Sequence, residues 1–561
     1  MIREKISKLV QKSIKGLQKE GVFPKFGMPK IKIEKPEERI HGDYSTNVAM
    51  VICRSGSTRI STRKDAEGLK PVKVVNILVA KLKDLKESHD LFEKIEAVSP
   101  GFINFFLKKE FLQKQVREIL KNEEKFGQLK IGKNIKTNVE FISANPTGQL
   151  HIGNGRGAFW GDTLANVLEK AGFKVTREYY INEARTNTQI KLLGQTALGK
   201  GTTYLNEYLK SKIEKIKPQL SKIKDEGEAG YLLAKEIQKG IKEFVEKKLK
   251  IKFDKWFPDT KLYQESKIEK ILHWLKKNNF VYQKEGAWWI KTSKFGDNQD
   301  WVLIRSEKEG GEPTYFLCDI AYHKDKIDRG FKKIIDIWGA DHQGHVRKMK
   351  AAMKVVGFKG DLNLLITQIV RIKGFKISKR KGEIIPLEDL INEVGLDVAR
   401  FFYLQKSLDT QMEFDLELAK EQSEKNPVYY VQYAHTRICG ILRKLKTKSE
   451  KLKMTTKNLK LLNHPSELEL IKQLIRFPEI IEDTAKDYQL QRIPQYALDL
   501  ATAFHQFYRD CPVLRPNKKR IKTNDKDSSD LRVARLGLVL ATKQVIKNTL
   551  DLMGISAPAR M

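Results

Sequence analysis

Cysteine is scarce in this sequence of 561 residues. The four cysteines, Cys53, Cys318, Cys439 and Cys511, stand far apart, and none belongs to a C-x-x-C pair. Closely spaced cysteines normally mark zinc sites and disulfide frameworks. We therefore predict no metal site within the protein, and we expect the cysteines to be packing residues of a protein from a reducing compartment.

Long apolar runs are also missing. No stretch of about 20 apolar residues is present that would span a membrane. The N-terminal segment 1–20 is amphipathic and lacks the apolar centre of a signal peptide. We therefore expect a cytoplasmic protein that does not engage a membrane.

Acidic residues are too few to balance the basic ones. Lysine and arginine total 106 against 70 acidic residues, which gives a formal charge of +36. A lysine-rich, solvated surface explains part of this excess. The remainder favours a polyanionic partner such as nucleic acid, because a positive field speeds encounter with it.

The length and the pattern of elements indicate several domains. At about 100–200 residues per domain, the chain should hold three to five. Residues 1–110 look like a small α/β unit that opens with a helix and closes on a strand at 101–107. The pattern from about 410 to the end is helical throughout, apart from a solvated loop at 515–529.

The middle of the chain shows a strand–loop–helix–strand unit. Strands are expected at 138–143 and 174–182, with a glycine-rich loop and a helix from about Arg156 to Gly172 between them. This is the βαβ pattern of a Rossmann-type sheet. A lysine-rich helical insertion, which includes D-K-W-F at 254–257, is predicted over about 195–285. Further strands are then expected at 288–290, 301–305, 314–317, 334–338 and 362–370.

The first chemical motif is H-I-G-N at 151–154, which follows a strand and opens a helix. A helix start at the carboxyl end of a parallel sheet favours a phosphate, because its N–H groups are free and its dipole is positive there. Gly153 lets the backbone approach a ligand closely, and His151 can donate to a phosphate oxygen. A lone histidine is more often structural, so this motif alone is weak.

The second motif is K-I-S-K at 376–379, within G-F-K-I-S-K-R-K-G. Lysines on a glycine-flanked loop can neutralise phosphate charge as it develops. In so lysine-rich a chain, a solvated basic loop is the ordinary explanation for such a tetrapeptide.

Together, the two motifs favour a functional role over these structural explanations. Their order and their placement in one α/β region resemble the H-I-G-H and K-M-S-K signatures of class I aminoacyl-tRNA synthetases. Longer blocks resemble the arginyl-tRNA synthetase family in particular, over essentially the whole chain. They include V-E-F-I-S-A-N-P-T-G-Q-L-H-I-G-N-G at 139–155, P-T-Y-F-L-C-D-I-A-Y-H-K-D-K at 313–326, W-G-A-D-H-Q-G-H at 338–345, V-G-L-D-V-A-R-F-F at 394–402 and G-D-Y-S-T-N-V-A-M at 42–50.

This resemblance implies a multidomain α/β plus all-α architecture. A small α/β tRNA-binding domain would occupy 1–110, a Rossmann-type catalytic domain 130–410 with its helical insertion at 195–285, and a helical-bundle anticodon-binding domain 420–561. The implied activity is ATP-dependent activation of L-arginine, with Mg²⁺, and its transfer to tRNA(Arg). We expect a monomer in the cytoplasm.

The resemblance also assigns site residues. A guanidinium offers five donors in a planar fork and prefers carboxylates, but the sequence does not decide which carboxylate holds guanidinium and which holds ammonium. The implied arginine-binding residues are Glu140, Asn145, Tyr315, Asp319 and His342. The implied catalytic residues are His151, Asn154, Lys376, Ser378 and Lys379. The implied ATP-binding residues are His151, Gly153, Asn154, Gly339, Asp341, Lys376 and Lys379.

One position departs from the family pattern, since asparagine stands at 154 where the signature usually has histidine. Asn154 either donates to ATP phosphates or merely caps the following helix. In the helical region, aromatic rings beside a cation suit single-stranded bases, which points to Tyr429, Tyr433 and Arg437 as tRNA-binding residues. Some of the neighbouring aromatic and polar side chains must instead be core.

Two alternatives compete with this interpretation. Another class I synthetase, lysyl or cysteinyl, is disfavoured by the blocks around Glu140 and Tyr315. A degenerate relative that binds tRNA without charging it is supported only by Asn154.

Overall fold

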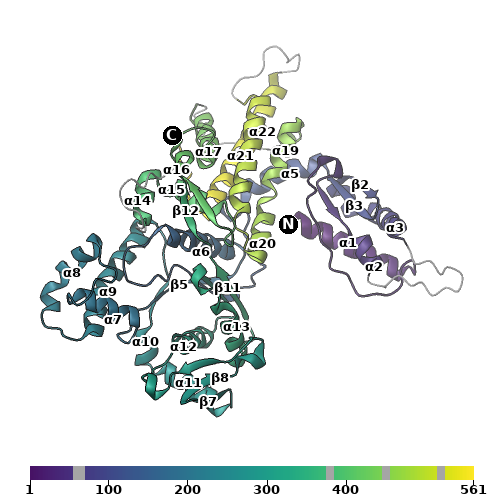
Figure 1. Ribbon diagram of the computed structural model, residues 1–561. Helices are drawn as coiled ribbons and strands as arrows, with labels where there is room; N and C mark the ends of the chain where they lie inside the picture. Colours follow the sequence, from purple (N-terminus) through teal and green to yellow (C-terminus); the bar gives the residue numbers. More distant parts are fainter. Residues whose placement is uncertain (55–69, 374–384, 445–454, 514–524) are drawn as a thin grey trace.

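The computed structural model describes residues 1–54, 70–373, 385–444, 455–513 and 525–561, without the side chains of Thr456 and 525–528. Figure 1 shows three parts: an N-terminal unit set apart on one side, an α/β unit with its insertions, and a helical unit between them. The multidomain α/β plus all-α fold class expected from the sequence is confirmed.

The N-terminal unit is a three-stranded antiparallel sheet covered by helices. Strand β3 (Phe102–Leu107) lies between β1 (Tyr44–Thr46) and β2 (Phe92–Val98). Helix α1 (Ile2–Lys19) buries Ile6, Val10 and Ile14 at helical spacing, as its sequence predicts. The other helices here are α2 (Val48–Arg54), α3 (Pro71–Lys83) and α4 (Lys86–Leu91).

The N-terminal unit is attached to the helical unit by polar contacts between side chains as well as by the connecting polypeptide. The hydroxyl of Tyr44 donates to Glu479 at 3.0 Å, and Arg3 pairs with Asp483 at 2.6 Å. Glu479 is 2% exposed. Helix α5 (Lys109–Asn122) continues the connection, because Gln113 donates to the backbone oxygen of Leu462.

The α/β unit is built on five parallel strands in the order β11-β10-β4-β5-β6. The strands are β4 (Lys136–Glu140), β5 (Lys174–Ile181), β6 (Lys255–Pro258), β10 (Lys333–Trp338) and β11 (Asp361–Ile366). The chain winds outward from β4 to β6, then returns to the other side of β4 for β10. Such a reversal opens a crevice at the carboxyl ends of β4 and β10, where ligands bind in folds of this kind.

Helices cover both faces of this sheet. Gly157 of α6 (Ile152–Lys170) lies against Ile337 of β10, whereas Asp336, the preceding residue, contacts α12 (Tyr315–Asp328) on the other side. Successive strand residues point to opposite faces, so α6 and α12 sandwich the sheet. Helix α6 begins at Ile152, earlier than the start predicted near Arg156.

The region predicted as a helical insertion at 195–285 is not helical throughout. Helices α7 (Thr188–Ala197), α8 (Glu207–Leu220) and α9 (Glu226–Glu243) are followed by β6, which contains K-W-F and joins the main sheet beside β5. Trp256 of β6 stacks on Tyr179 of β5 at 4.6 Å. Four residues are too few to show a strand period, which is why the sequence did not separate β6 from the helices.

A second excursion lies between β6 and β10. Helices α10 (Thr260–Gln264) and α11 (Lys267–Lys277) precede a separate antiparallel sheet of β7 (Val281–Lys284), β8 (Ala287–Ile290) and β9 (Trp301–Ile304). The strand predicted at 314–317 is wrong, because T-Y-F-L forms the N-cap and first turn of α12. Its aromatic residues resemble a strand, whereas Thr314 at the N-cap was the helix signal.

The helical unit begins after one short strand. Strand β13 (Met412–Asp415) pairs in parallel with β12 (Val370–Lys373), so the expectation of helix alone from 410 is wrong at this point. Helix α13 (His345–Val355) belongs to the α/β unit, between β10 and β11. The remaining helices are α14 (Leu387–Val394), α15 (Leu396–Leu404), α16 (Leu416–Lys420), α17 (Pro427–Lys444), α18 (Thr456–Leu459), α19 (Pro465–Leu474), α20 (Phe477–Asp487), α21 (Arg492–Asp510) and α22 (Asp525–Leu552).

Candidate active site

A cleft of about 1170 Å³ lies at the carboxyl ends of β4 and β10. It is bounded by the start of α6, by the loop after β10 and by the segment that follows β11. Seven of the residues proposed from the sequence line it: Asn145, His151, Gly153, Asn154, Gly339, Asp341 and His342. Residues almost 200 positions apart thus meet where the fold provides a crevice.

His151 is the N-cap of α6, and its ring is fixed by the backbone. The N–H of Gly153 donates to His151 Nδ1 at 3.1 Å. Burial lowers the pKa of His151, so the ring is neutral near pH 7. Because Nδ1 accepts a hydrogen bond, the proton of the neutral ring sits on Nε2, which is therefore a donor.

Asn154 closes a capping box with the same histidine. Its Oδ1 accepts from the backbone N–H of His151 at 2.9 Å. Asn154 is thus at the third helical position rather than at the N-cap itself. The cap uses only the amide oxygen of Asn154. Because Asn154 lines the cleft, its Nδ2 donors remain for a ligand there.

Two glycines of the cleft have no room for a side chain. A Cβ at Gly153 would lie 2.8 Å from the His151 ring, and one at Gly339 would lie 2.6 Å from Asp341 Oδ1. Any side chain at either position would push aside a residue proposed to contact ATP.

Lys376, Ser378 and Lys379 lie outside the described residues. The described chain on either side borders the cleft, through Ile372 before the segment and Ile385 after it. Ile385 also accepts a hydrogen bond from the N–H of Ile152 at 3.0 Å, which ties it to the first turn of α6.

A smaller pocket of about 90 Å³ lies beyond the ends of β5 and β6, and it contains Tyr315 and Asp319. Asp319 Oδ2 lies 2.8 Å from His345 Nε2, and its side chain is 31% exposed. The Tyr315 hydroxyl donates to Asn187 Oδ1 at 3.1 Å. Asn145 links this pocket to the cleft, because its Oδ1 accepts from Asn182, a pocket residue, at 2.7 Å.

Asp259 is a pocket residue that sequence reasoning did not single out. It follows β6 directly and is 5% exposed, and burial raises its pKa to about 6. Its Oδ1 accepts from the N–H of Glu183 at 2.9 Å. The signal that was available is W-F-P-D, a carboxylate at the end of a short aromatic strand.

Glu140 does not line either cavity. It is 5% exposed, and its carboxylate is taken up by Lys326 at 2.6 Å and by the hydroxyl of Ser143 at 2.9 Å. The structure therefore does not bring Glu140 together with Tyr315 and Asp319 as a free carboxylate.

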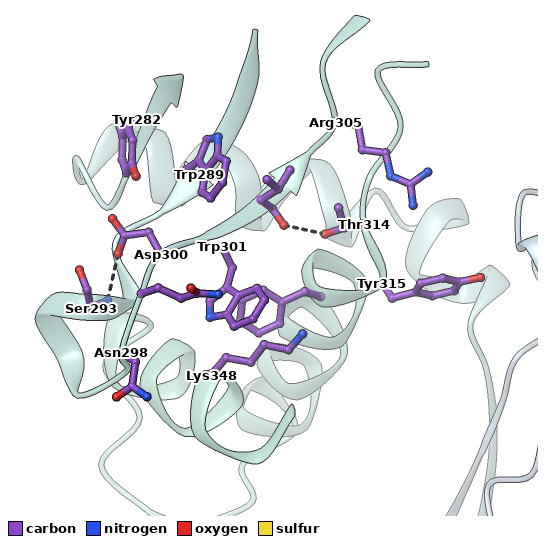
Figure 2. Close-up of a pocket in the computed structure, with 13 residues that line it drawn as sticks. Tyr282, Trp289, Ser293, Asn298, Asp300, Trp301, Arg305, Thr314, Tyr315 and Lys348 are labelled. Atoms are coloured by element: carbon purple, nitrogen blue, oxygen red, sulfur yellow. Dashed lines mark hydrogen bonds between the residues drawn. The ribbon is translucent and has the colours of Figure 1, made fainter. Parts of the chain in front are cut away.

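Tyr315 also borders a third hollow of about 760 Å³. Figure 2 shows this hollow under Tyr282, Trp289 and Trp301 of the antiparallel sheet, with the Tyr315 ring pointing away from these aromatic rings. The Lys348 ammonium lies 4.6 Å from the Trp301 ring centre. Tyr315 lines both this hollow and the small pocket, and it therefore lies between them. It is 52% exposed, so its ring is not part of a packed core.

The residues proposed for RNA contact form one stripe on α17. The rings of Tyr429 and Tyr433 are nearly parallel, with centroids 6.4 Å apart, and the Arg437 guanidinium lies 4.8 Å from the Tyr433 ring. Tyr433 is 38% exposed. The neighbouring Gln432 and His435 are buried instead and hold the segment at 556–558.

Three family models match almost the whole chain. They are the arginyl tRNA synthetase N terminal domain over 2–107, the catalytic domain of class I (R) tRNA synthetases over 115–252 and 233–438, and the DALR anticodon binding domain over 431–561. An arginine–tRNA ligase of Caldanaerobacter subterraneus is 39% identical over all of this chain and 99% of its own length. The chain belongs to the arginyl-tRNA synthetase family.

Other arginyl-tRNA synthetases agree with this assignment. The arginine–tRNA ligase of Listeria welshimeri is 37% identical over the full length of both chains. The arginyl-tRNA synthetase structure of Thermus thermophilus matches the fold with a TM-score of 0.78 at 20% identity, covering 100% of both chains. Membership of this family removes the lysyl and cysteinyl alternatives.

The described residues show neither a membrane-spanning helix nor a metal-binding cluster. Among the helices of the described residues, none is long and apolar enough to cross a membrane. In the same part of the chain, no group of three or more His, Cys, Asp or Glu side chains is arranged to hold a metal ion.

Proposed function

We propose that this chain activates arginine with ATP and transfers it to tRNA(Arg), with ATP in the large cleft and the arginine side chain in the neighbouring pocket. Arginyl-tRNA synthetase function follows from the family. The observation that carries the site assignment is the meeting of the α6 N-terminus, the loop after β10 and a carboxylate pocket at one edge of the sheet.

ATP would lie with its phosphates over the start of α6. The free N–H groups and dipole of that helix attract anions. His151 Nε2 and Asn154 Nδ2 add donors on the same side. Gly339 and Asp341 would face the nucleoside from the loop after β10, and Lys376 and Lys379 would neutralise the phosphates.

Mg²⁺ would accompany ATP rather than occupy a protein cage. Asp341 is the only carboxylate among the described residues that line the cleft, and its side chain is 81% exposed. One carboxylate plus phosphate oxygens and water is a usual set for Mg²⁺ in nucleotide sites. The ion would supply charge neutralisation on the phosphates, while the protein residues hold and orient the nucleotide.

The guanidinium would face Asp319 and Asp259 across the small pocket, with the Tyr315 hydroxyl as a further partner. Both carboxylates line that pocket, whereas Glu140 is occupied by Lys326. Asn145 and His342, which line the cleft, would then stand near the amino-acid backbone. This arrangement gives the guanidinium fork the acceptors it prefers.

The chemistry needs no covalent enzyme intermediate. The arginine carboxylate attacks the α-phosphorus, pyrophosphate leaves, and the terminal ribose hydroxyl of tRNA then attacks the arginyl-adenylate. Rate enhancement would come from placement of the reactants and stabilisation of charge by His151, Asn154, Lys376, Ser378 and Lys379.

The RNA would be held at a distance from this chemistry. The Tyr429–Tyr433–Arg437 stripe offers two aromatic faces and a cation to unstacked anticodon bases. The N-terminal unit would bind another part of the tRNA, and the charge of +36 would attract the whole polyanion. We expect the enzyme to act as a monomer in the cytoplasm.

A charging assay tests this proposal directly. The full-length chain should attach arginine, and none of the other nineteen amino acids, to tRNA(Arg) in the presence of ATP and Mg²⁺. Tight binding of tRNA without any charging would favour the degenerate relative and would overturn the assignment of His151 and Asn154 to catalysis.

A further inference from the structure

Three carboxylates stand side by side inside the α/β unit. Asp336 of β10 is paired in register with Glu140 of β4, which is paired in register with Glu178 of β5. Residues at the same level of neighbouring parallel strands point to the same face, about 5 Å apart. All three are at most 5% exposed, so their charges are not screened by water. We call them the carboxylate row.

Helix α12 supplies what neutralises this row. Lys326, which is fully buried, donates to Glu140 at 2.6 Å and to Asp336 at 2.7 Å. Arg329 donates to both oxygens of Glu178, at 2.6 and 2.8 Å. Tyr322 also donates to Glu178, at 3.0 Å, and His323 Nε2 lies 2.8 Å from Asp336 Oδ2. One stripe of the helix is therefore fastened to three strands of the sheet.

The same helix carries the proposed arginine ligands at its other end. Tyr315 begins α12 and Asp319 follows one turn later, about two turns before Lys326. The strands held by Lys326 lead into the two loops that line the ATP cleft. Lys326 thus lies at the junction between the arginine side and the ATP side of the site.

The row also supports the loop after β4. Glu140 Oε1 accepts from the Ser143 hydroxyl, and Ile142 and Ser143 both have left-handed backbones, with φ of 68° and 41°. Such residues are held only where the surroundings fix them. This strained turn redirects the chain from β4 toward Asn145 and His151.

We propose that Lys326 is a positioning residue for arginine binding, which fixes the Tyr315–Asp319 end of α12 relative to the strand ends of the ATP cleft. The inference rests on the proposed arginine pocket. Lys326 touches no substrate in this scheme and acts through Glu140, Asp336 and its own helix. A buried amine between two carboxylates on adjacent strands is a costly arrangement, which is reasonable where it sets a geometry.

The charges of the row are consistent with this role. Burial would raise the pKa of Asp336, but Lys326 and His323 bring it down to about 2. Burial raises the pKa of Glu140, and Lys326 opposes that shift. Without Lys326, no lysine or arginine would lie between Glu140 and Asp336, which are faced by each other and by Ser143, Tyr180, Tyr322, His323 and Glu178. One of the two carboxylates would then hold a proton near neutral pH.

The test compares Lys326→Met with wild type in full-length enzyme. Loss of the ammonium should raise the arginine KM by about 10-fold or more, because α12 is no longer fixed. The ATP KM should stay within about 3-fold, because the cleft loops remain on the sheet. The variant should also gain a pH dependence that wild type lacks: ionisation of the unpaired carboxylates should lower its Tm and raise its arginine KM from pH 6 to pH 9.

Arg535→Met is the matched control. Arg535 pairs with buried Glu467 at 2.7 Å in the helical unit, so its loss also breaks an ion pair with a buried carboxylate. It should lower the Tm without changing either KM. If folded Lys326→Met raises both KM values equally, or neither, the positioning role is wrong.

Asp336→Asn decides the question if Lys326→Met does not fold. It keeps the size of the side chain and weakens the contacts of Asp336 with Lys326 and His323, so an arginine KM raised about 3-fold with unchanged ATP KM would support the proposal, and no change would overturn it. Arginine binding by calorimetry in the presence of tRNA is measured alongside. A wild-type enzyme that binds arginine but does not charge tRNA would contradict the proposed function. The arginine affinities of the variants would still decide the role of Lys326.

Discussion

At the scale of single residues, Asn154 combines an observed role with a proposed one. Its amide oxygen completes the capping box of α6, while its amide nitrogen, in a residue that lines the cleft, is proposed to donate to an ATP phosphate. Histidine, the usual family residue, would supply a donor from a ring, whereas asparagine supplies it from an amide. The two tasks can be separated because aspartate retains the acceptor and loses the donor.

Asn154→Asp should therefore raise the ATP KM and leave the Tm nearly unchanged. Asn154→Ala should raise the ATP KM and also lower stability by about 1 kcal/mol, the usual value of a helix cap. Asn154→His should be tolerated. Steady-state kinetics and thermal melts of the three variants measure both effects, and normal ATP use by Asn154→Asp would rule out the phosphate contact.

Asp319 is a pocket carboxylate that remains partly exposed, and its charge is the property to test. Asp319→Asn keeps the shape and a contact to His345 but removes the charge, so arginine binding should weaken by about 2–4 kcal/mol. The arginine KM measures this loss, and the ATP KM should persist. Asp328→Asn, on the exposed end of the same helix, is the control and should change neither value. An unchanged arginine KM in Asp319→Asn would remove Asp319 from the pocket.

At the scale of elements, the helices α17 and α21 are joined by a histidine. The His505 ring of α21 lies 4.9 Å from Tyr430 and 6.0 Å from Tyr433, ring centre to ring centre. Burial, with a contribution from Arg437, lowers its pKa to about 4. The Tyr429–Tyr433–Arg437 stripe, which we propose as the RNA contact, therefore packs against an uncharged imidazole.

This depressed pKa predicts an acid-sensitive helical unit. The unfolded chain takes up a proton near pH 6.5, whereas folded His505 resists it until about pH 4, so stability is present above pH ~6.5 and is lost as pH falls toward 4. Melting curves over pH 4–8 should show this loss. His505→Phe keeps a ring in place and should reduce the pH dependence; an identical slope in both proteins would show that other groups cause it.

The sequence predicted the elements that carry strong local signals. The β4–loop–α6 unit was found because glycine, asparagine and proline mark the loop and an apolar period marks the helix. Strand β6 was missed because it has four residues, and the start of α12 was misread because its aromatic residues favour strands. The capture of Glu140 by Lys326 was beyond local reasoning, since the two are 186 positions apart.

At the scale of the whole molecule, charge and domain attachment decide how the enzyme meets its RNA. The N-terminal unit is attached to the helical unit through Tyr44, Arg3 and Glu479, so polar contacts join the two parts of the proposed RNA surface. With a charge of +36, much of the binding free energy should come from release of counterions by the tRNA.

Raising salt should therefore weaken tRNA binding far more than arginine binding. Between 50 and 200 mM salt, the tRNA KM should rise roughly 10-fold or more, whereas the arginine KM should change less than about 2-fold, because its contacts lie in a small pocket. Charging assays at several salt concentrations measure both. A tRNA KM independent of salt would mean that the positive surface is not used for RNA.

The segment at 556–558 contacts both α15 and α17, so its loss by mutation of the gene should matter. Gln432 of α17 donates to the backbone oxygen of Ser556, and His435 contacts that of Pro558, while Ser556 also donates to Asp397 of α15. A stop codon at position 555 would remove this segment and its contacts to both helices, and would leave the direct bond from Gln432 to Asp397 at 2.9 Å as the only hydrogen bond between α15 and α17 among the described residues. A nonsense mutation at position 555 of this gene should therefore behave as a severe allele.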